Sequence, residues 1–441
     1  MFLLIGCFSE QWLRRCPEEP PFLKGRRGRR NPVAHIIAGI DVGTTKVCTL
    51  IAEVEEEEEG SPFVRIIGIG DVPSKGMRRG GVVNLTQVTD SIIKSVEQAE
   101  RLAGVSISKA YVSVTGTHIA SISSRGVVAI HRRGGGITPE DVARVVDAAS
   151  AIAVPYNREI LHSIPRYFVV DDQGGIQDPV GMEGTRLEAE VHIITASTPA
   201  VNNLIKCVRE AGVEVEELIL ASLASGEAVL TPAEKEMGVI VADIGGGTTD
   251  VAVYAEGSVL YAGTLEVGGE HITNDIAFGL RMPFSSAEEV KKKYGHSLPD
   301  EIPEEEGVEA LVFGEEAHKS ISRRFMAEVI QARMEEIFEL IYREVQKAGY
   351  EGLLPAGLVL CGGTAELSGI SKLGRRYLNM PVRVGRPSGI HGLVDALGSP
   401  AYATAVGLIL WPLRHRPYKI EAKGYTWLGK IIDWLKSFLP D

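Results

Sequence analysis

The stretch VADIGGGTTDVAVY, residues 241–254, places three consecutive glycines between two apolar runs. Glycine offers no side chain to a core and loses more backbone entropy on ordering than any other residue, so such a turn is costly. Both flanking runs have the composition of strands, and an aspartate stands on each side of the turn. The pattern therefore predicts a strand–turn–strand unit whose turn has a role other than core packing.

An earlier stretch of the chain repeats this pattern. IAGIDVGTTKVCTLIAEV at residues 37–54 and IVADIGGGTTDVAVYAEG at residues 240–257 both run apolar strand, aspartate, glycine turn, Thr-Thr and apolar strand. Asp41 and Asp243 hold the same place in the two copies. Internal similarity of this kind predicts a duplicated domain.

The residue types in both turns suit the phosphates of a nucleotide. Glycines let backbone N–H groups approach an anion closely, and threonine hydroxyls add further donors. An aspartate at the end of a strand suits a hydrated Mg²⁺, which keeps several of its waters. A Rossmann or Walker loop needs a helix directly after its glycines, whereas both turns here run into a second strand. One such turn is explained by an ordinary hairpin, but two matched copies favour a phosphate site.

A third glycine element, LCGGTAELSGI at residues 360–370, has the pattern of a strand, Gly362-Gly363 and a helix. Because glycines have no side chain, they can lie flat against an adenine or a ribose. The three elements in this order resemble the actin-type ATPases, which include heat-shock chaperones, sugar kinases and bacterial actins. The resemblance implies an α/β, two-lobed actin-like ATPase fold with duplicated ribonuclease-H-like domains, and ATP and Mg²⁺ as cofactors.

Carried over residue by residue, the resemblance implies an ATP site made of the three glycine elements and their neighbours. SSAEEVKKK at residues 285–293 matches the segment with which bacterial actins and chaperones contact adenosine. A surface helix capped by Ser286 and Glu289 is the alternative interpretation of that segment. Asp41 and Asp243 are expected to hold Mg²⁺ through water. The expected ATP-binding residues are Asp41, Gly43, Thr44, Thr45, Lys46, Asp243, Gly245, Gly246, Gly247, Thr248, Gly268, Gly269, Glu288, Lys291, Gly362 and Gly363.

Within this superfamily the chain resembles FtsA, the actin-like bacterial cell-division family, over residues 35–441. The resemblance is carried by GVVNLTQV, ILHSIPRYFVVDDQGGIQDPVGMEGTRLEAEVHIIT and RRFMAEVIQARMEEI. It implies a first lobe over residues 35–81 and 168–225 and an inserted FtsA-type subdomain over residues 82–167. A second lobe is expected over residues 226–411, with its subdomain 2B at about 280–350.

The C-terminus has an amphipathic pattern behind a polar linker at residues 412–426. GYTWLGKIIDWLKSFLP predicts an amphipathic helix over residues 427–439. Trp and Phe side chains at this end favour a membrane anchor over a protein-docking helix. Since each buried large side chain contributes roughly 1.5–3 kcal/mol, one such helix should bind membranes reversibly. The expected membrane-binding residues are Trp427, Leu428, Ile431, Ile432, Trp434, Leu435 and Phe438.

The resemblance to FtsA also implies partners and a place of action. It implies an actin-like filament of the chain with itself, binding to FtsZ, and contact of later divisome proteins with the inserted subdomain. The place implied is the anionic inner face of the cytoplasmic membrane at the division septum. The FtsZ tail is expected on the subdomain with the long helix, where Arg324 and Glu328 are candidate contacts. The alternative for these two residues is a surface salt bridge at i,i+4.

Strong ATP hydrolysis is not expected. Chaperones carry a glutamate near the attacking water in the first connecting helix, and VEELILASLASGEAVL places Ala221 at that position. Alanine can neither orient a water nor accept a proton, and the neighbouring Glu227 is the substitute that remains open. No catalytic residue is therefore assigned, and slow ATPase activity at most is expected. The alternatives are a pilus-assembly-type FtsA relative, which should lack the C-terminal anchor, and an active ATPase or kinase of the same superfamily.

The bulk composition limits the remaining possibilities. A net charge of −12 argues against nucleic-acid binding as a general function. The five cysteines lack CxxC spacing, which predicts reduced thiols without a metal cluster or disulfide. No apolar run approaches the length of a membrane-spanning helix, about 18 residues. Residues 1–34 are Pro- and Arg-rich, so we expect a disordered tail or a start site assigned too far upstream.

Overall fold

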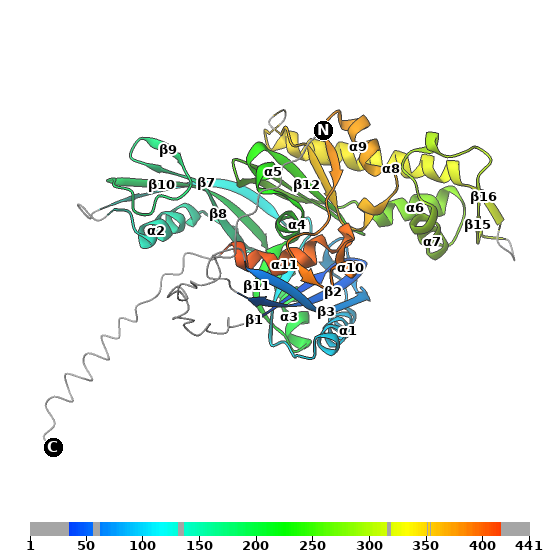
Figure 1. Cartoon of the computed structure of the whole chain (residues 1–441), viewed down its shortest axis with the longest axis horizontal. Coiled ribbons are helices and arrows are strands. Elements are labelled where there is room, and N and C mark those ends of the chain that lie inside the picture. Colours follow the sequence, from blue (N-terminus) through cyan, green and yellow to red (C-terminus); the bar gives the residue numbers. More distant parts are fainter. Residues whose placement is uncertain are drawn as a thin grey trace, which may run out of the picture.

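The computed structural model describes residues 35–55, 62–130, 136–314, 319–350, 352 and 354–415. The tail expected at residues 1–34, the linker from residue 416 onward and the amphipathic helix expected over 427–439 lie outside the described residues. The described chain forms two α/β lobes, an inserted subdomain and two helices that cross between the lobes (Figure 1).

The first lobe is built on a six-stranded sheet with the order β11-β6-β1-β2-β3-β19. β1, β2 and β3 form an antiparallel meander, and β6 and β11 join in parallel on the other side of β1. Val88, Ile92 and Val96 lie on the buried face of α1, which packs on this sheet. The elements are β1 (His35–Val42), β2 (Lys46–Glu55), β3 (Phe63–Pro73), the short β4 (Met77–Arg78) and β5 (Gly81–Val82), α1 (Leu85–Ala103), β6 (Lys109–Val114), α3 (Thr198–Glu210), β11 (Glu214–Leu220), β19 (His391–Gly392) and α10 (Val394–Leu397).

The second lobe repeats this topology in a five-stranded sheet with the order β14-β13-β12-β17-β18. β12, β13 and β14 form the meander, and β17 and β18 join in parallel beside β12. The duplication that the two glycine motifs predict is therefore confirmed. The elements are α5 (Pro232–Met237), β12 (Val239–Ile244), β13 (Thr249–Ala255), β14 (Ser258–Leu265), α6 (Gly269–Gly279), α7 (Phe284–Tyr294), η1 (Pro299–Glu301), β15 (Gly307–Ala310), β16 (Lys319–Ser322), α8 (Arg323–Lys347), β17 (Leu358–Cys361), η2 (Gly363–Glu366), α9 (Ile370–Leu378) and β18 (Val382–Val384).

The inserted subdomain is a four-stranded sheet with the order β7-β10-β8-β9, and α2 covers one face of it. Its elements are β7 (Ala120–Ala129), α2 (Pro139–Ser150), β8 (Arg158–Val170), β9 (Gln173–Ile176) and β10 (Arg186–Ser197). These bounds differ from the expected 82–167. α1 and β6 belong to the first lobe, and the insert cannot end at residue 167, because β10 pairs with β7 on one side and with β8 on the other.

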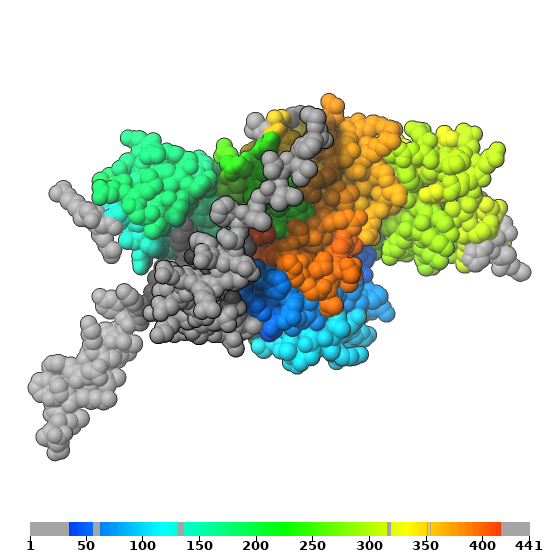
Figure 2. Space-filling model, viewed as in Figure 1, coloured from blue at the N-terminus to red at the C-terminus, as the bar shows by residue number. Residues whose placement is uncertain are grey.

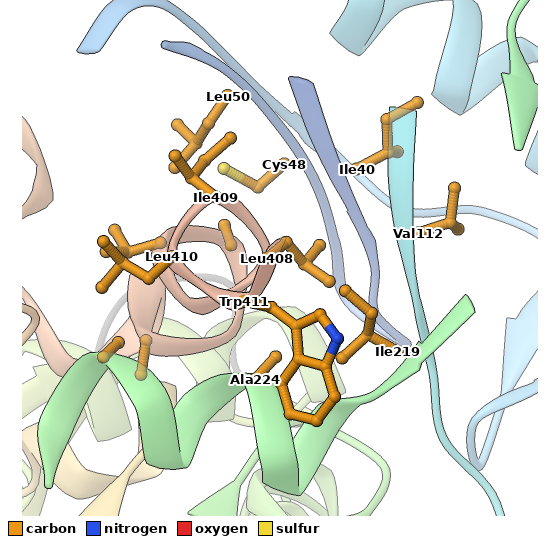
Figure 3. Close-up of a cluster of buried hydrophobic side chains, with 14 of the residues drawn as sticks. Ile40, Cys48, Leu50, Val112, Ile219, Ala224, Leu408, Ile409, Leu410 and Trp411 are labelled. Carbon is orange, nitrogen blue, oxygen red and sulfur yellow. The ribbon is translucent and has the colours of Figure 1, made fainter. Parts of the chain in front are cut away.

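Two helices, α4 (Ala221–Val229) and α11 (Ala403–Arg414), cross between the lobes. They cross so closely that a Cβ at Gly407 would overlap the carbonyl oxygen of Ala224. Figure 3 shows Leu408, Ile409 and Trp411 of α11 in the core beneath the first-lobe sheet. α11 continues to Arg414, so the first residues of the expected linker are helical rather than extended chain.

The inserted subdomain and the β15–β16 hairpin lie at opposite ends of the molecule (Figure 2). η3 (Pro400–Tyr402) leads directly into α11. Within the described part of the chain, no helix combines the length and the apolar composition that spanning a membrane requires.

Candidate functional site

A cleft of about 910 Å³ lies between the two lobes. Its lining includes both glycine turns, the Gly362-Gly363 pair, one face of α7 and η3. All the expected ATP-binding residues line this cleft except Gly247 and Gly268. The fold thus brings together residues that are far apart in the sequence.

The two glycine turns have the same length and the same closing hydrogen bond. The Gly43 amide donates to the Lys46 carbonyl at 2.9 Å, and the Gly245 amide donates to the Thr248 carbonyl at 2.9 Å. The Thr-Thr pairs nevertheless do not correspond. Thr44 and Thr45 lie within the first turn, whereas residue 248 closes the second turn and residue 249 begins β13. Strand register therefore equates Asp41 with Asp243 but not the threonine pairs, which is a difference from the predicted repeat.

The glycines of the second turn provide space rather than an unusual backbone conformation. None of the three has a positive φ. A Cβ at Gly246 would overlap the side chain of Thr45, and a Cβ at Gly247 would stand 2.8 Å from Thr44 Cγ2. The two turns therefore meet face to face across the cleft, and only glycine permits this approach.

Gly247 and Gly268 do not line the cleft, but both make close contacts around the second turn. A Cβ at Gly268 would stand 2.6 Å from the Gly245 carbonyl oxygen. At the start of α6, the amides of Gly269 and Glu270 donate to the carbonyls of Gly245 and Gly246, both at 2.8 Å. Gly268 thus lets α6 hold the second turn in place, whereas Gly247 makes room for Thr44 of the first turn.

Asp41 and Asp243 each stand one residue before the end of their strands; Asp243 is buried and Asp41 is half-buried. Ser113 Oγ donates to Asp41 Oδ1 at 2.8 Å, and Thr404 Oγ1 donates to Asp243 Oδ2 at 2.6 Å. Burial raises the pKa of Asp41, although the hydrogen bond from Ser113 opposes this shift. Burial, with the nearby Asp250 and Asp41 charges, raises the pKa of Asp243 to about 7. Clustered carboxylates of this kind gain from a cation, so the site fits a hydrated Mg²⁺.

Asp250 is a third cleft carboxylate, which the sequence analysis quoted but did not assign to the site. It pairs in register with Asp243 across β12 and β13. It accepts hydrogen bonds from Thr115 Oγ1 at 2.5 Å and Thr264 Oγ1 at 2.6 Å, and burial raises its pKa to about 6. The first copy has Cys48 at the equivalent position, opposite Asp41. The last residue of GGGTTD could therefore have identified Asp250 as a site residue. Comparison of the two copies did not reveal it, because the first copy has a cysteine at the equivalent position.

Glycine is needed at positions 362 and 363 for different reasons. Gly362 has φ +81°, and a Cβ there would overlap Asp243 Oδ1. Gly363 meets only the Ala401 Cβ at 3.9 Å, so its face toward the cleft is open. Gly362 is therefore needed by the backbone, while Gly363 leaves space for a planar ligand.

Glu288 and Lys291 occur on α7 as the sequence suggested. Lys291 Nζ donates to the Gly269 carbonyl at 2.9 Å and to Thr273 Oγ1 at 2.7 Å, and it pairs with Glu288 Oε2 at 2.7 Å. Burial lowers the pKa of Lys291. α7 begins at Phe284 without a side-chain cap, so the alternative capping box of Ser286 and Glu289 is not formed.

Ala221 begins α4 and lines the cleft, whereas Glu227 lies near the far end of the same helix and does not. Only 4% of the Glu227 side chain is exposed, and it pairs with Lys235 Nζ at 2.6 Å and with Arg414 Nη1 at 2.9 Å. Burial alone would raise the pKa of Glu227, but the neighbouring cations lower it. Glu227 is therefore held in a charge cluster and does not replace a carboxylate at position 221.

Arg324 and Glu328 lie outside the cleft, near the N-terminus of α8. Arg324 Nη1 pairs with Glu304 Oε1 at 2.8 Å, so the alternative pair with Glu328 is not formed. Three phenylalanines of the same lobe are exposed: Phe278 is 84% exposed, Phe313 67% and Phe325 43%. The Phe313 amide donates to the Arg281 carbonyl, three residues after Phe278. The Phe325 ring comes within 4.0 Å of a Cβ built at Gly279, next to Phe278. We call Phe278, Phe313 and Phe325 the aromatic patch.

Two family profiles match the chain. One, described as "Cell division protein FtsA", covers residues 240–407. The other, described as "SHS2 domain inserted in FTSA", covers residues 116–195 and corresponds to β7–β10. The second range agrees with the observed bounds of the inserted subdomain rather than with the expected 82–167.

Curated proteins of similar sequence are cell division proteins named FtsA. The protein from Pseudomonas aeruginosa is 41% identical, over 86% of this chain and 89% of its own length. The protein from Escherichia coli K12 is 35% identical, over 91% of this chain and 98% of its own length. A solved structure, the PilM-PilN type IV pilus biogenesis complex, is similar with a TM-score of 0.60, at 16% identity over 86% of this chain and 98% of that chain. At that identity the likeness shows the fold alone.

Proposed function

The chain belongs to the FtsA family of actin-like cell division proteins, and from this premise we propose that it binds ATP between its lobes, forms actin-like filaments and tethers the FtsZ ring to the inner face of the cytoplasmic membrane. The observation that carries ATP binding is the meeting of two glycine turns and three carboxylates in one interlobe cleft. The pilus-type alternative has less support, because its solved relative shares the fold at only 16% identity.

Different residues of the cleft would contact the phosphates, the cation and the adenosine of Mg²⁺-ATP. The Gly43 and Gly245 amides close the two turns, so the amides of Thr44, Thr45 and Gly246, which line the cleft, would face the phosphates. Asp41 and Asp243 would hold the hydrated cation, which would offset their mutual repulsion. Gly363 and the Glu288–Lys291 pair would contact the adenosine, where Gly363 leaves space for it.

ATP binding is proposed as a conformational signal rather than as a step of rapid hydrolysis. Ala221 stands at the cleft end of α4 and presents only a methyl group. Glu227, the remaining candidate for that role, is held by Lys235 and Arg414 away from the cleft. Phosphate release should therefore be slow.

The aromatic patch and Arg324 are the proposed docking place for the FtsZ tail. Large contiguous patches of exposed apolar side chains mark sites of protein interaction. The Arg324–Glu304 pair is largely exposed on the Glu304 side and contributes little to stability, so a partner's carboxylate can replace it. Later divisome proteins are proposed to bind the inserted subdomain.

The test is co-sedimentation with vesicles that contain anionic lipid. Full chain, a chain ending after Arg416 and a Trp434→Glu variant are compared, each with ATP and with or without FtsZ. The full chain should sediment with the vesicles and bring FtsZ down, whereas both altered chains should stay in solution. Membrane binding by the shortened chain would disprove the anchor at residues 427–439. Sedimentation without FtsZ would disprove the tether and favour a pilus-type role.

A further inference from the structure

We propose that Asp71 and Tyr402 are positioning residues that hold the Lys46 ammonium on η3, so that only a ligand with a third phosphate, the γ-phosphate, draws it away. Lys46 would then distinguish a nucleoside triphosphate from a diphosphate by leaving this position. We call the Ala401 carbonyl, the Tyr402 ring and Asp71 the lysine cradle. The inference rests on the proposed binding of nucleotide in the cleft.

The Lys46 ammonium has three protein partners in the cleft. Lys46 ends the first glycine turn, yet its Nζ donates to the Ala401 carbonyl at 2.9 Å. The same Nζ lies 3.7 Å from the centroid of the Tyr402 ring and 4.0 Å from Asp71 Oδ2. A cation over an aromatic face is attracted by the ring quadrupole. The ammonium is thus satisfied by protein groups within the cleft.

The cradle itself is rigidly built. Tyr402 Oη donates to Asp71 Oδ2 at 2.6 Å, which fixes the ring and the carboxylate together. Burial and this contact with Asp71 raise the pKa of Tyr402. Lys46, Asp71, Ala401 and Tyr402 all line the cleft. Any anion that uses Lys46 must therefore compete with the cradle.

η3 is also joined to the other lobe, which makes the position of Lys46 significant. The Gly362 amide donates to the Pro400 carbonyl at 3.0 Å, and Ser399 Oγ donates to Glu366 Oε1 at 2.6 Å. α11 follows η3 directly, and its Thr404 bonds to Asp243. One short segment thus connects the first glycine turn, the Gly362-Gly363 element and a helix that crosses between the lobes.

Triphosphates and diphosphates differ in the negative charge that they bring to Lys46. The γ-phosphate of a triphosphate adds negative charge near the first turn and competes with the lysine cradle for the Lys46 ammonium. A diphosphate lacks that group, so Lys46 stays in the cradle and the cradle does not affect its affinity. Weakening the cradle should therefore tighten triphosphate binding and leave diphosphate binding unchanged.

The test measures the dissociation constants of the full chain for Mg²⁺-ADP and for a non-hydrolysable Mg²⁺-ATP analogue by calorimetry. Tyr402→Leu should bind the analogue roughly fivefold more tightly, the effect of about one cation–π contact, with the ADP constant unchanged. Tyr402→Phe, which keeps the ring face but loses the hydrogen bond to Asp71, should tighten binding of the analogue less than Tyr402→Leu does. In a Lys46→Met background, Tyr402→Leu should change neither constant.

Two results would overturn this inference but not the proposed binding of nucleotide. Equal weakening of both ligands in Tyr402→Leu would assign the ring to base binding, and two dissociation constants that both stay at their wild-type values would show that the cradle does not compete. A wild-type chain that binds neither nucleotide would instead overturn the proposed function, and the inference with it. Thermal unfolding of Tyr402→Leu and Tyr402→Phe verifies that both variants are folded.

Discussion

Thr45 of the first turn occupies the space into which a side chain at position 246 of the second turn would project. The contact joins the two lobes at the centre of the cleft, where each turn presents its backbone to the other. The glycine triplet is therefore explained by the neighbour it faces.

A methyl group at position 246 should open the cleft. Gly246→Ala would overlap Thr45, so the lobes must separate or the turn must shift, and we expect at least a tenfold loss of Mg²⁺-ATP affinity, about 1.4 kcal/mol. Thr45→Ala combined with Gly246→Ala should recover part of it, because the overlapping methyl is removed. Gly174→Ala, whose Cβ meets only Val169 at 3.9 Å, is the matched control. Unchanged affinity in Gly246→Ala would refute the close approach.

Asp243 should make the ligand-free protein less stable as the pH rises. Its pKa is about 7 in the fold against 3.8 for the free side chain, so between these values the folded state holds a proton that the unfolded state has lost. Stability from this group is present below about pH 4 and is lost as the pH rises through 7. Without Mg²⁺, Asp243→Asn should therefore melt a few degrees above the wild type at pH 8.

The same substitution should remove Mg²⁺-dependent binding of ATP. Differential scanning calorimetry from pH 5 to 8, with and without Mg²⁺-ATP, measures both effects. Asp90→Asn, at an exposed position on α1, should show no such pH-dependent gain. A melting temperature of Asp243→Asn below that of the wild type at pH 8 without ligand would contradict the prediction.

The Glu227 cluster should be important for stability. Glu227→Ala removes the buried carboxylate that pairs with Lys235 and Arg414, and breaking a buried pair costs about 3–5 kcal/mol. Glu214→Ala breaks an exposed pair with Arg209 and should cost less than about 1 kcal/mol. Urea unfolding measures both values. Equal costs for the two variants would show that the cluster contributes no more than a surface pair.

ATP turnover should be slow and limited by the residue at position 221. We expect phosphate release at least tenfold below the roughly 1–100 s⁻¹ of kinases. Ala221→Glu should raise the rate of phosphate release about tenfold, because the carboxylate can act as a general base toward the attacking water. Ala221→Leu controls for bulk. A wild-type rate within the kinase range would refute the interpretation of Ala221.

The aromatic patch should bind the C-terminal peptide of FtsZ. Phe278→Ser and Arg324→Glu should each weaken binding at least tenfold in fluorescence anisotropy, as expected when a buried anchor or a paired charge is lost. Tyr156→Ser, at a fully exposed ring before β8 of the inserted subdomain, is the control. If the control alone weakens binding, the docking place lies on the inserted subdomain instead.

Most of the cleft could be predicted because its residues occupy local patterns. Glycine turns after apolar strands, and the Glu288–Lys291 spacing on α7, depend on neighbours in the sequence. Asp250 and Tyr402 could not be found in this way. Asp250 has Cys48 as its counterpart in the first copy, and Tyr402 lies in a short η3 whose partners, Lys46 and Asp71, come from the first lobe.

The sequence by itself determined the duplicated strand–turn–strand units, the positions of Asp41 and Asp243 and the family, because each rests on short-range patterns or on overall similarity. Only the tertiary structure decided that the threonine pairs take different places in the two turns, where the inserted subdomain begins and ends, and which groups Lys46 contacts. Strand register and lobe packing set these features. Both depend on contacts between residues far apart in the chain, which no local pattern records.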